Sequence, residues 1–173
     1  MAILKKLEFM KLNACRFIGK SVYATPGSSE IGGLWGDCEK IFMAIDHLKE
    51  YATDEIHNAA LITWDKYEEQ NKLMGYTIGK FMKMDTPVPE GLDFIDLPDT
   101  FVAKGWIEGE FDDVISNAEA LTKEAAKKQN EYTLTSWEFM AEVYTKEPTP
   151  EDGENYVLGY YIACKEKHHV ASK

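Results

Sequence analysis

The sequence predicts an α+β fold made of two pseudo-symmetric βαββ units, in which antiparallel sheets and two main helices form a ligand groove. Three observations predict it. Strand-like and helix-like apolar patterns follow one another in the order β-α-β-β, and this order occurs twice. A proline-rich stretch separates the two occurrences. The chain has 173 residues, of which 45% are hydrophobic, and this size and composition suit one domain.

The limits of the two units follow from the same patterns. We expect a single domain over residues 1–173, with the first unit at about residues 1–84, the linker at residues 85–98 and the second unit at about residues 99–167. Pairing the two units would bury part of their open sheet faces and leave a groove between them, where small molecules commonly bind. We expect both helices on one side of the sheets and the groove on the other.

The first unit begins with Leu12–Tyr23, whose β-branched and aromatic residues predict a strand. Apolar residues then recur at helical spacing and predict an amphipathic helix over Leu34–Glu50. Two further apolar runs, Ala59–Trp64 and Tyr76–Met82, predict strands that are joined by a polar hairpin loop at residues 65–72.

The second unit repeats this pattern beyond the linker. The linker holds Pro87, Pro89 and Pro98, so it cannot be helical throughout. The patterns then predict a strand at Phe101–Ile107, a helix at Asp112–Lys128, a strand at Trp137–Tyr144, a loop at residues 147–155 and a final strand at Tyr156–Cys164.

Composition and charge exclude several classes of function. The formal net charge of −11 repels phosphate backbones and anionic lipid surfaces, so we expect no nucleic-acid and no membrane partner. Three cysteines without CxxC spacing argue against a disulfide framework or a zinc site, and we expect a cytoplasmic protein with mostly buried thiols. The motifs of metal hydrolases, serine hydrolases and nucleotide-binding proteins do not occur, so we expect no metal and no cofactor.

A series of short motifs resembles the family of GyrI-like domains. The motifs follow the family's order over nearly all the chain, and they lie at Ile31–Asp37, Tyr76–Gly79, Val88–Gly91, Leu97-Pro98, Phe101–Ala103 and Glu142–Tyr144. The sequence departs from the family pattern at Ala60-Leu61-Ile62 and at Lys104, which affects the expected pocket lining. The family includes the ligand-sensing halves of AraC-type and MerR-type multidrug regulators as well as free-standing proteins. The resemblance begins near Ile3, so we expect a binding module without a DNA-binding segment of its own.

Glu142 is the main candidate for a site residue. Alternation along the predicted strand places it on one face with three other residues, Glu138, Met140 and Tyr144. The opposite face, with Trp137, Phe139, Ala141 and Val143, is wholly apolar, and we expect it to pack under the helices. Position alone also fits a solvent-exposed Glu142 on an open sheet. The resemblance instead implies that this glutamate lies in the ligand pocket.

Aromatic residues on the predicted strands supply the other candidates. Flat aromatic walls stack on planar compounds and attract cations through their ring faces. Tyr160 and Tyr161 are neighbours and point to opposite faces, so only one of them can line the groove. The expected ligand-binding residues are Glu142, Tyr144, Met140, Trp106, Tyr160 and Trp64.

Three functions remain open. The first is a binder of planar aromatic or cationic small molecules, with Glu142 pairing with the ligand cation and detoxification as one use of such binding. The second, implied by the resemblance, is a cyclopropanoid-type hydrolase that opens cyclopropane-bearing, DNA-alkylating compounds, with Glu142 as the general base toward water. The third is a protein-interaction module such as a gyrase modulator. The sequence determines neither the natural ligand nor the oligomeric state.

Overall fold

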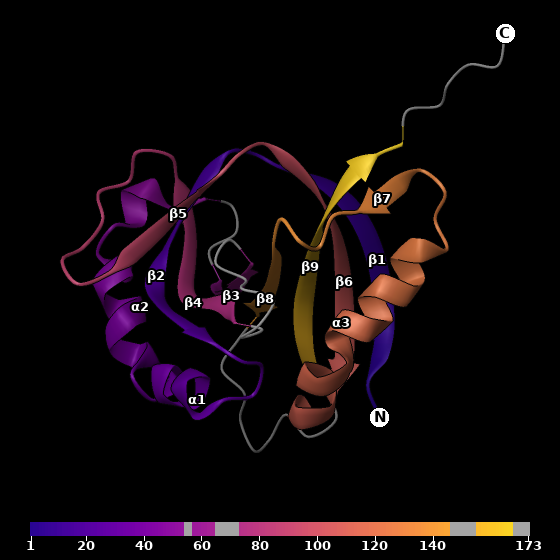
Figure 1. The fold of residues 1–173 in the computed structure, drawn as a ribbon, viewed down its shortest axis with the longest axis horizontal. Coiled ribbons are helices and arrows are strands. Elements are labelled where there is room, and N and C mark those ends of the chain that lie inside the picture. The colour runs from indigo at the N-terminus through magenta and orange to yellow at the C-terminus, as the bar shows by residue number, and fades with distance from the viewer. Residues whose placement is uncertain (54–56, 65–72, 146–154, 168–173) are drawn as a thin grey trace, which may run out of the picture.

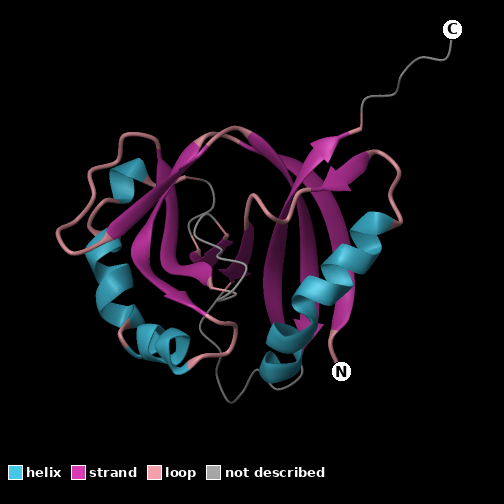
Figure 2. Ribbon diagram, viewed as in Figure 1, coloured by secondary structure: helices cyan, strands magenta, loops and turns pink. Residues whose placement is uncertain are grey.

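One antiparallel sheet of nine strands joins the two halves of the chain. The computed structural model describes residues 1–53, 57–64, 73–145 and 155–167. Figures 1 and 2 show the sheet with α1 and α2 toward one of its ends and α3 toward the other. The strands are β1 (Ile3–Leu12), β2 (Cys15–Ala24), β3 (Asn58–Thr63), β4 (Met74–Lys83), β5 (Asp93–Leu97), β6 (Thr100–Gly109), β7 (Tyr132–Leu134), β8 (Met140–Tyr144) and β9 (Tyr156–Glu166). The helices are α1 (Ser29–Gly36), α2 (Cys38–Asp46) and α3 (Phe111–Lys127), with a short 3-10 turn η1 (Lys49–Tyr51).

The strand order confirms the α+β class and the two βαββ units. The order across the sheet is β1-β6-β9-β8-β3-β4-β2-β5, with β7 beside β9. The first unit contributes β2, β4 and β3, the second contributes β6, β9 and β8, and the two units meet where β3 pairs with β8. At that junction Ala60 lies opposite Glu142. The centre of the sheet is therefore shared by both units.

Two strands that the sequence patterns did not predict extend the sheet at its ends. β1 pairs with β6, so the first strand of the chain joins the second unit. β5 lies within the expected linker and pairs with β2 in the first unit. Both carry charged residues, which are common on edge strands and obscure the apolar alternation that marks a central strand.

The predicted first helix is two helices in the structure. α1 begins earlier than expected, at Ser29, and the helix is interrupted at Asp37 before α2 begins. The early segment contains Gly32, Gly33 and Gly36, and glycine weakens the helical apolar pattern. The second predicted helix agrees with α3 to within one residue at each end. Among the described residues, every helix is too short or too polar to cross a bilayer.

The strand predicted at Trp137–Tyr144 begins only at Met140. The preceding residues form a turn. The backbone N–H of Glu138 donates to the carbonyl oxygen of Thr135, and the hydroxyl of Thr135 donates to the carboxylate of Glu138. Trp137 is consequently 65% exposed and does not lie on a strand. The loops expected at residues 65–72 and 147–155 fall outside the described residues, except for Asn155.

The two faces of the sheet carry separate cores. One face packs against the helices and holds Ile45, Ile78, Val114 and Leu158. The other holds Phe139, Val143 and the ring of Phe81, which contacts the rings of Phe17 and Tyr161. The apolar face of β8 therefore packs away from the helices, which corrects the expectation that it lies under them.

The expectation that the groove lies on the side of the sheet opposite the helices is also wrong. α1 and α2 pack on β2 and β4, while α3 packs on β6 and β9. The central strands β3 and β8 lie between these two groups of helices. The space over the centre of the sheet is therefore on the same side as the helices.

A close approach of β2 and β4 explains one of the sequence motifs. Gly19 lies opposite Gly79 in the register of these two strands. A Cβ atom on either glycine would lie 1.9 Å from a backbone oxygen of the other strand, at Ile78 or Ile18. The glycine that ends the Tyr76–Gly79 motif is therefore required by backbone contact.

Candidate functional site

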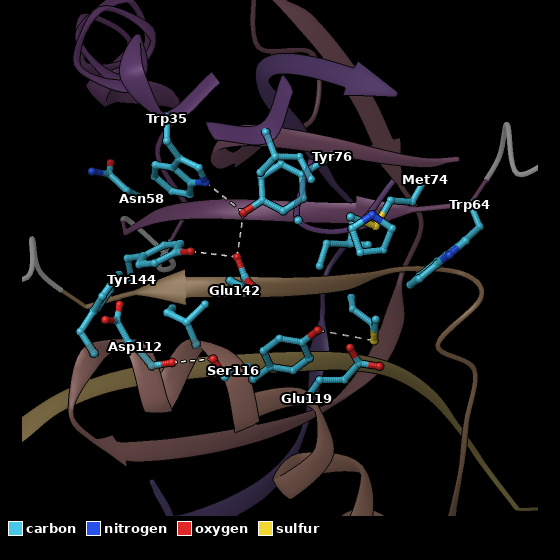
Figure 3. Close-up of a pocket in the computed structure, with 18 residues that line it drawn as sticks. Trp35, Asn58, Trp64, Met74, Tyr76, Asp112, Ser116, Glu119, Glu142 and Tyr144 are labelled. Atoms are coloured by element: carbon cyan, nitrogen blue, oxygen red, sulfur yellow. Dashed lines mark hydrogen bonds between the residues drawn. The ribbon is translucent and has the colours of Figure 1, made fainter. Parts of the chain in front are cut away.

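A cavity of about 1210 Å³ lies over the centre of the sheet, between α1 and α3. Its volume exceeds the roughly 300–1,000 Å³ of typical ligand pockets, so it has room for a large organic molecule. Figure 3 shows side chains from both units pointing into it. The lining residues are Pro26, Gly27, Ile31, Trp35, Asn58, Ile62, Trp64, Met74, Tyr76, Phe111, Asp112, Ile115, Ser116, Glu119, Met140, Glu142, Tyr144 and Tyr160.

Regular periodicity brings these side chains together. The floor comes from alternate positions on the central strands, such as Met140, Glu142 and Tyr144 on β8. The walls come from one face of each helix, where Ile31 and Trp35 are four residues apart on α1 and Ile115 and Glu119 are four apart on α3. The cavity is thus built from both units.

Glu142 is the centre of a hydrogen-bond chain on the cavity floor. The hydroxyls of Tyr76 and Tyr144 each donate to its Oε2 atom at 2.8 Å. The indole N–H of Trp35 in turn donates to the Tyr76 hydroxyl at 3.1 Å (Figure 3). Among the described residues, both hydrogen bonds that Glu142 accepts go to Oε2. Oε1 therefore accepts no hydrogen bond from the described residues.

Burial raises the pKa of Glu142 above its ordinary value, because the charged form loses its hydration. The hydrogen bonds from Tyr144 and Tyr76 oppose this effect by stabilising the carboxylate, and the negative charge of Glu119 adds to the increase. The pKa values of Tyr76 and Tyr144 are raised as well, mainly by burial and by the charge of Glu142. Both hydroxyls therefore remain protonated donors at neutral pH.

The charges that line the cavity all have one sign. Glu142, Glu119 and Asp112 carry carboxylates, and the described lining contains no Lys, Arg or His. Ion pairs within the described part of the chain involve Glu119, through Lys123, but not Glu142. The carboxylate of Glu142 on the cavity floor therefore has no cationic partner among the described residues.

Aromatic rings surround this carboxylate. Trp35 lies edge-on to Tyr144, with ring centroids 5.0 Å apart. Phe111 and Tyr160 line the cavity from α3 and β9. The Tyr160 hydroxyl donates to the sulfur of Met140 at 3.7 Å. Most of the wall is thus apolar or aromatic, with the polar groups concentrated at a few positions.

Five of the six residues predicted for the site line this cavity, namely Glu142, Tyr144, Met140, Tyr160 and Trp64. Trp106 lies elsewhere, where its indole N–H donates to Glu8 and the ammonium of Lys104 lies 4.3 Å from its ring centroid. Tyr160 and Tyr161 point to opposite faces as expected, and Tyr161 belongs to the core on the face without helices.

The sequence patterns did not single out several lining residues. Trp35 and Tyr76 lie inside the motifs Ile31–Asp37 and Tyr76–Gly79, so the motifs contained the signal although no role was assigned to these two side chains. Glu119 lies one turn beyond Ile115 on the amphipathic α3. Only the fold shows that Ile115 and Glu119 line the cavity.

The fold and the cavity together are those of a small-molecule binding domain, with two βαββ units around one ligand-sized space. The comparison with family models gives the particular family. The chain belongs to the family of the GyrI-like small molecule binding domain, whose model matches residues 5–165. The resemblance seen in the sequence motifs is therefore confirmed. No curated protein matches the chain by sequence.

Solved structures with the same fold include a ligand-bound protein, the C-terminal domain of EcmrR and a hydrolase. SAV2435 bound to tetraphenylphosphonium has a TM-score of 0.68 at 16% identity, over 92% of this chain and 94% of that one. The EcmrR C-terminal domain has a TM-score of 0.63 at 13% identity, over 94% and 98%. A hydrolase encoded by lin2189 from Listeria innocua has a TM-score of 0.52 at 8% identity, over 93% and 92%.

Proposed function

We propose that this protein binds planar or bulky aromatic cations in the cavity, with Glu142 as the countercharge. The observation that carries the proposal is the buried Glu142 carboxylate, which accepts two tyrosine hydrogen bonds but has no cationic partner among the described residues. SAV2435, which shares the fold, has been solved with tetraphenylphosphonium, and that ion is a suitable first probe.

The energetics of burial favour a cationic ligand. A buried carboxylate without a cationic partner costs several kcal/mol, so a cation that enters the cavity gains by neutralising it. Trp35, Tyr76 and Tyr144 lie around the carboxylate and offer ring faces and edges to the apolar part of the ligand. Each cation–π contact adds about 0.5–2 kcal/mol. A hydrophobic cation therefore fits both features of the site.

The test compares tetraphenylphosphonium with neutral triphenylphosphine oxide in isothermal titration calorimetry. Glu142→Gln keeps the size of the side chain and removes the charge. This substitution should weaken binding of the cation by about 1–3 kcal/mol and leave binding of the neutral compound nearly unchanged. Glu138→Gln is the matched control, because Glu138 lies in the exposed turn before β8 and does not line the cavity. Equal binding of the cation to wild type and Glu142→Gln would overturn the proposal.

A second candidate function is hydrolysis of a reactive aromatic electrophile, such as a cyclopropane-bearing alkylating compound, which would detoxify it. The observation that favours this function is the raised pKa of Glu142 together with its unoccupied Oε1. A carboxylate with a raised pKa is a stronger base toward water, and the two tyrosine hydroxyls would hold its other oxygen in place.

The two functions differ in what Glu142→Gln does to a neutral electrophile. If Glu142 is a general base, the variant should bind the compound almost as wild type does, while its hydrolysis falls by about 10²–10⁴. A discontinuous chromatographic assay of the ring-opened product measures this. Absence of turnover above the uncatalysed rate in wild type would exclude the hydrolase and leave the binding proposal unaffected.

A further inference from the structure

A second carboxylate, Glu119, lines the cavity from a different wall. Glu142 lies on the floor in β8, whereas Glu119 lines the cavity from α3 (Figure 3). The charge of Glu119 raises the pKa values of both Glu142 and Tyr160, so its field reaches the cavity floor. The two carboxylates therefore act on the same space from two positions.

Glu119 is only partly neutralised by the protein. Its ion pair is with Lys123, one turn further along α3, and uses Oε1. Lys123 does not line the cavity, and its side chain is 30% exposed. A partly exposed pair at this spacing on one helix is weak, so Glu119 can exchange this partner for a ligand cation at low cost.

We infer that the cavity accepts elongated dications, with one cationic group at Glu142 and the second at Glu119. This inference rests on the proposed function and narrows its ligand class. The large volume leaves room for two cationic groups, and the apolar and aromatic lining suits the chain or ring system that joins them. Asp112, on the same helix, adds negative charge at the exposed end of this wall.

The experiment measures the affinity ratio between a dication and its single-headed analogue. Decamethonium carries two trimethylammonium groups on a decyl chain, and decyltrimethylammonium carries one. Competition against tetraphenylphosphonium gives both dissociation constants in one format. Wild type should prefer decamethonium by roughly fivefold, beyond the factor of two that two equivalent ends supply. Glu119→Gln should abolish this preference, because it should weaken decamethonium more than decyltrimethylammonium.

Two further variants make the test specific. Glu124→Gln is the matched control, because Glu124 also forms an ion pair four residues along α3, with Lys128, but does not line the cavity. It should retain the wild-type preference. Lys123→Gln removes the competing partner of Glu119 and should increase the preference for decamethonium.

The results separate this inference from the proposed function. If wild type binds tetraphenylphosphonium but shows no preference for decamethonium, or if Glu119→Gln keeps the preference, the second cation site is wrong and the first stands. If wild type binds none of the three cations, the proposed function itself fails, and this inference fails with it.

Discussion

Trp35 and Tyr144 meet edge to face over the cavity, with ring centroids 5.0 Å apart and ring planes at 70°. Trp35 belongs to α1 in the first unit, and Tyr144 belongs to β8 in the second. Trp35 also donates a hydrogen bond to Tyr76, and both tyrosines donate to Glu142. This single side chain therefore connects the wall formed by one unit with the acidic centre supplied by the other.

Replacing Trp35 by Phe should weaken the binding of tetraphenylphosphonium by about 0.5–1.5 kcal/mol, because the ring contact with Tyr144 changes and the hydrogen bond to Tyr76 is lost. Binding should also quench tryptophan fluorescence in wild type, and the quenching should decrease in this variant. Trp137→Phe is the control, since Trp137 is 65% exposed and does not line the cavity. Equal losses in the two variants would contradict a specific role for Trp35.

Cation affinity should rise with pH. Only the ionised form of Glu142 neutralises a cation, and burial holds its pKa above the ordinary value of 4.5. Below the raised pKa, the ligand must displace a proton from Glu142, so binding weakens as pH falls through that value. Calorimetry of tetraphenylphosphonium from pH 4 to pH 8, in buffers of different ionisation enthalpy, measures both the affinity and the released proton. Triphenylphosphine oxide should show no such dependence.

Glu142→Gln should stabilise the unliganded protein at neutral pH. Because the folded-state pKa is raised, the unfolded chain ionises first as pH increases. The stability associated with this group is complete below about pH 4.5 and is lost as pH rises through the folded-state pKa. The melting temperature of the variant should therefore exceed that of wild type by a margin that grows from acid to neutral pH.

Glu138→Gln should show the opposite pH dependence. Its hydrogen bond with Lys165 holds the pKa of Glu138 below the ordinary value, so its stabilising contribution is present at neutral pH and is lost in acid. The melting temperature of this variant should fall below that of wild type at neutral pH and approach it in acid. The same trend in both variants would contradict the assignment of Glu142 as the buried group.

Only one of the three thiols should react quickly in the native protein. Burial raises the pKa of Cys15 to about 11 and that of Cys164 to about 12, so neither supplies much thiolate at pH 8. Cys38 is half-buried. Ellman's reagent should modify one thiol in the folded protein and three in guanidinium chloride, and Cys38→Ser should remove the fast phase. Fast labelling of Cys15 or Cys164 would show that the sheet opens at those positions.

The sequence predicted much of the fold because the central strands and α3 have strong apolar periods. Alternation also placed Met140, Glu142 and Tyr144 on one face. Alternation cannot say which face of a strand borders the cavity, and this explains why Trp106 was assigned to the site. Trp35 and Tyr76 contact each other across 41 positions of sequence, and only the packing of α1 over β4 reveals that contact.

The pairing of β1 with β6 has a consequence for how the chain folds during synthesis. Leu4 of β1 pairs with Ile107 of β6, so β1 is synthesised about a hundred residues before the strand with which it pairs. β5 can pair with β2 as soon as the first unit has been synthesised, whereas β1 can join the sheet only after β6 has been made. Such distant pairing slows folding. The charged side chains of β1 would help to keep this waiting segment from associating with other nascent chains.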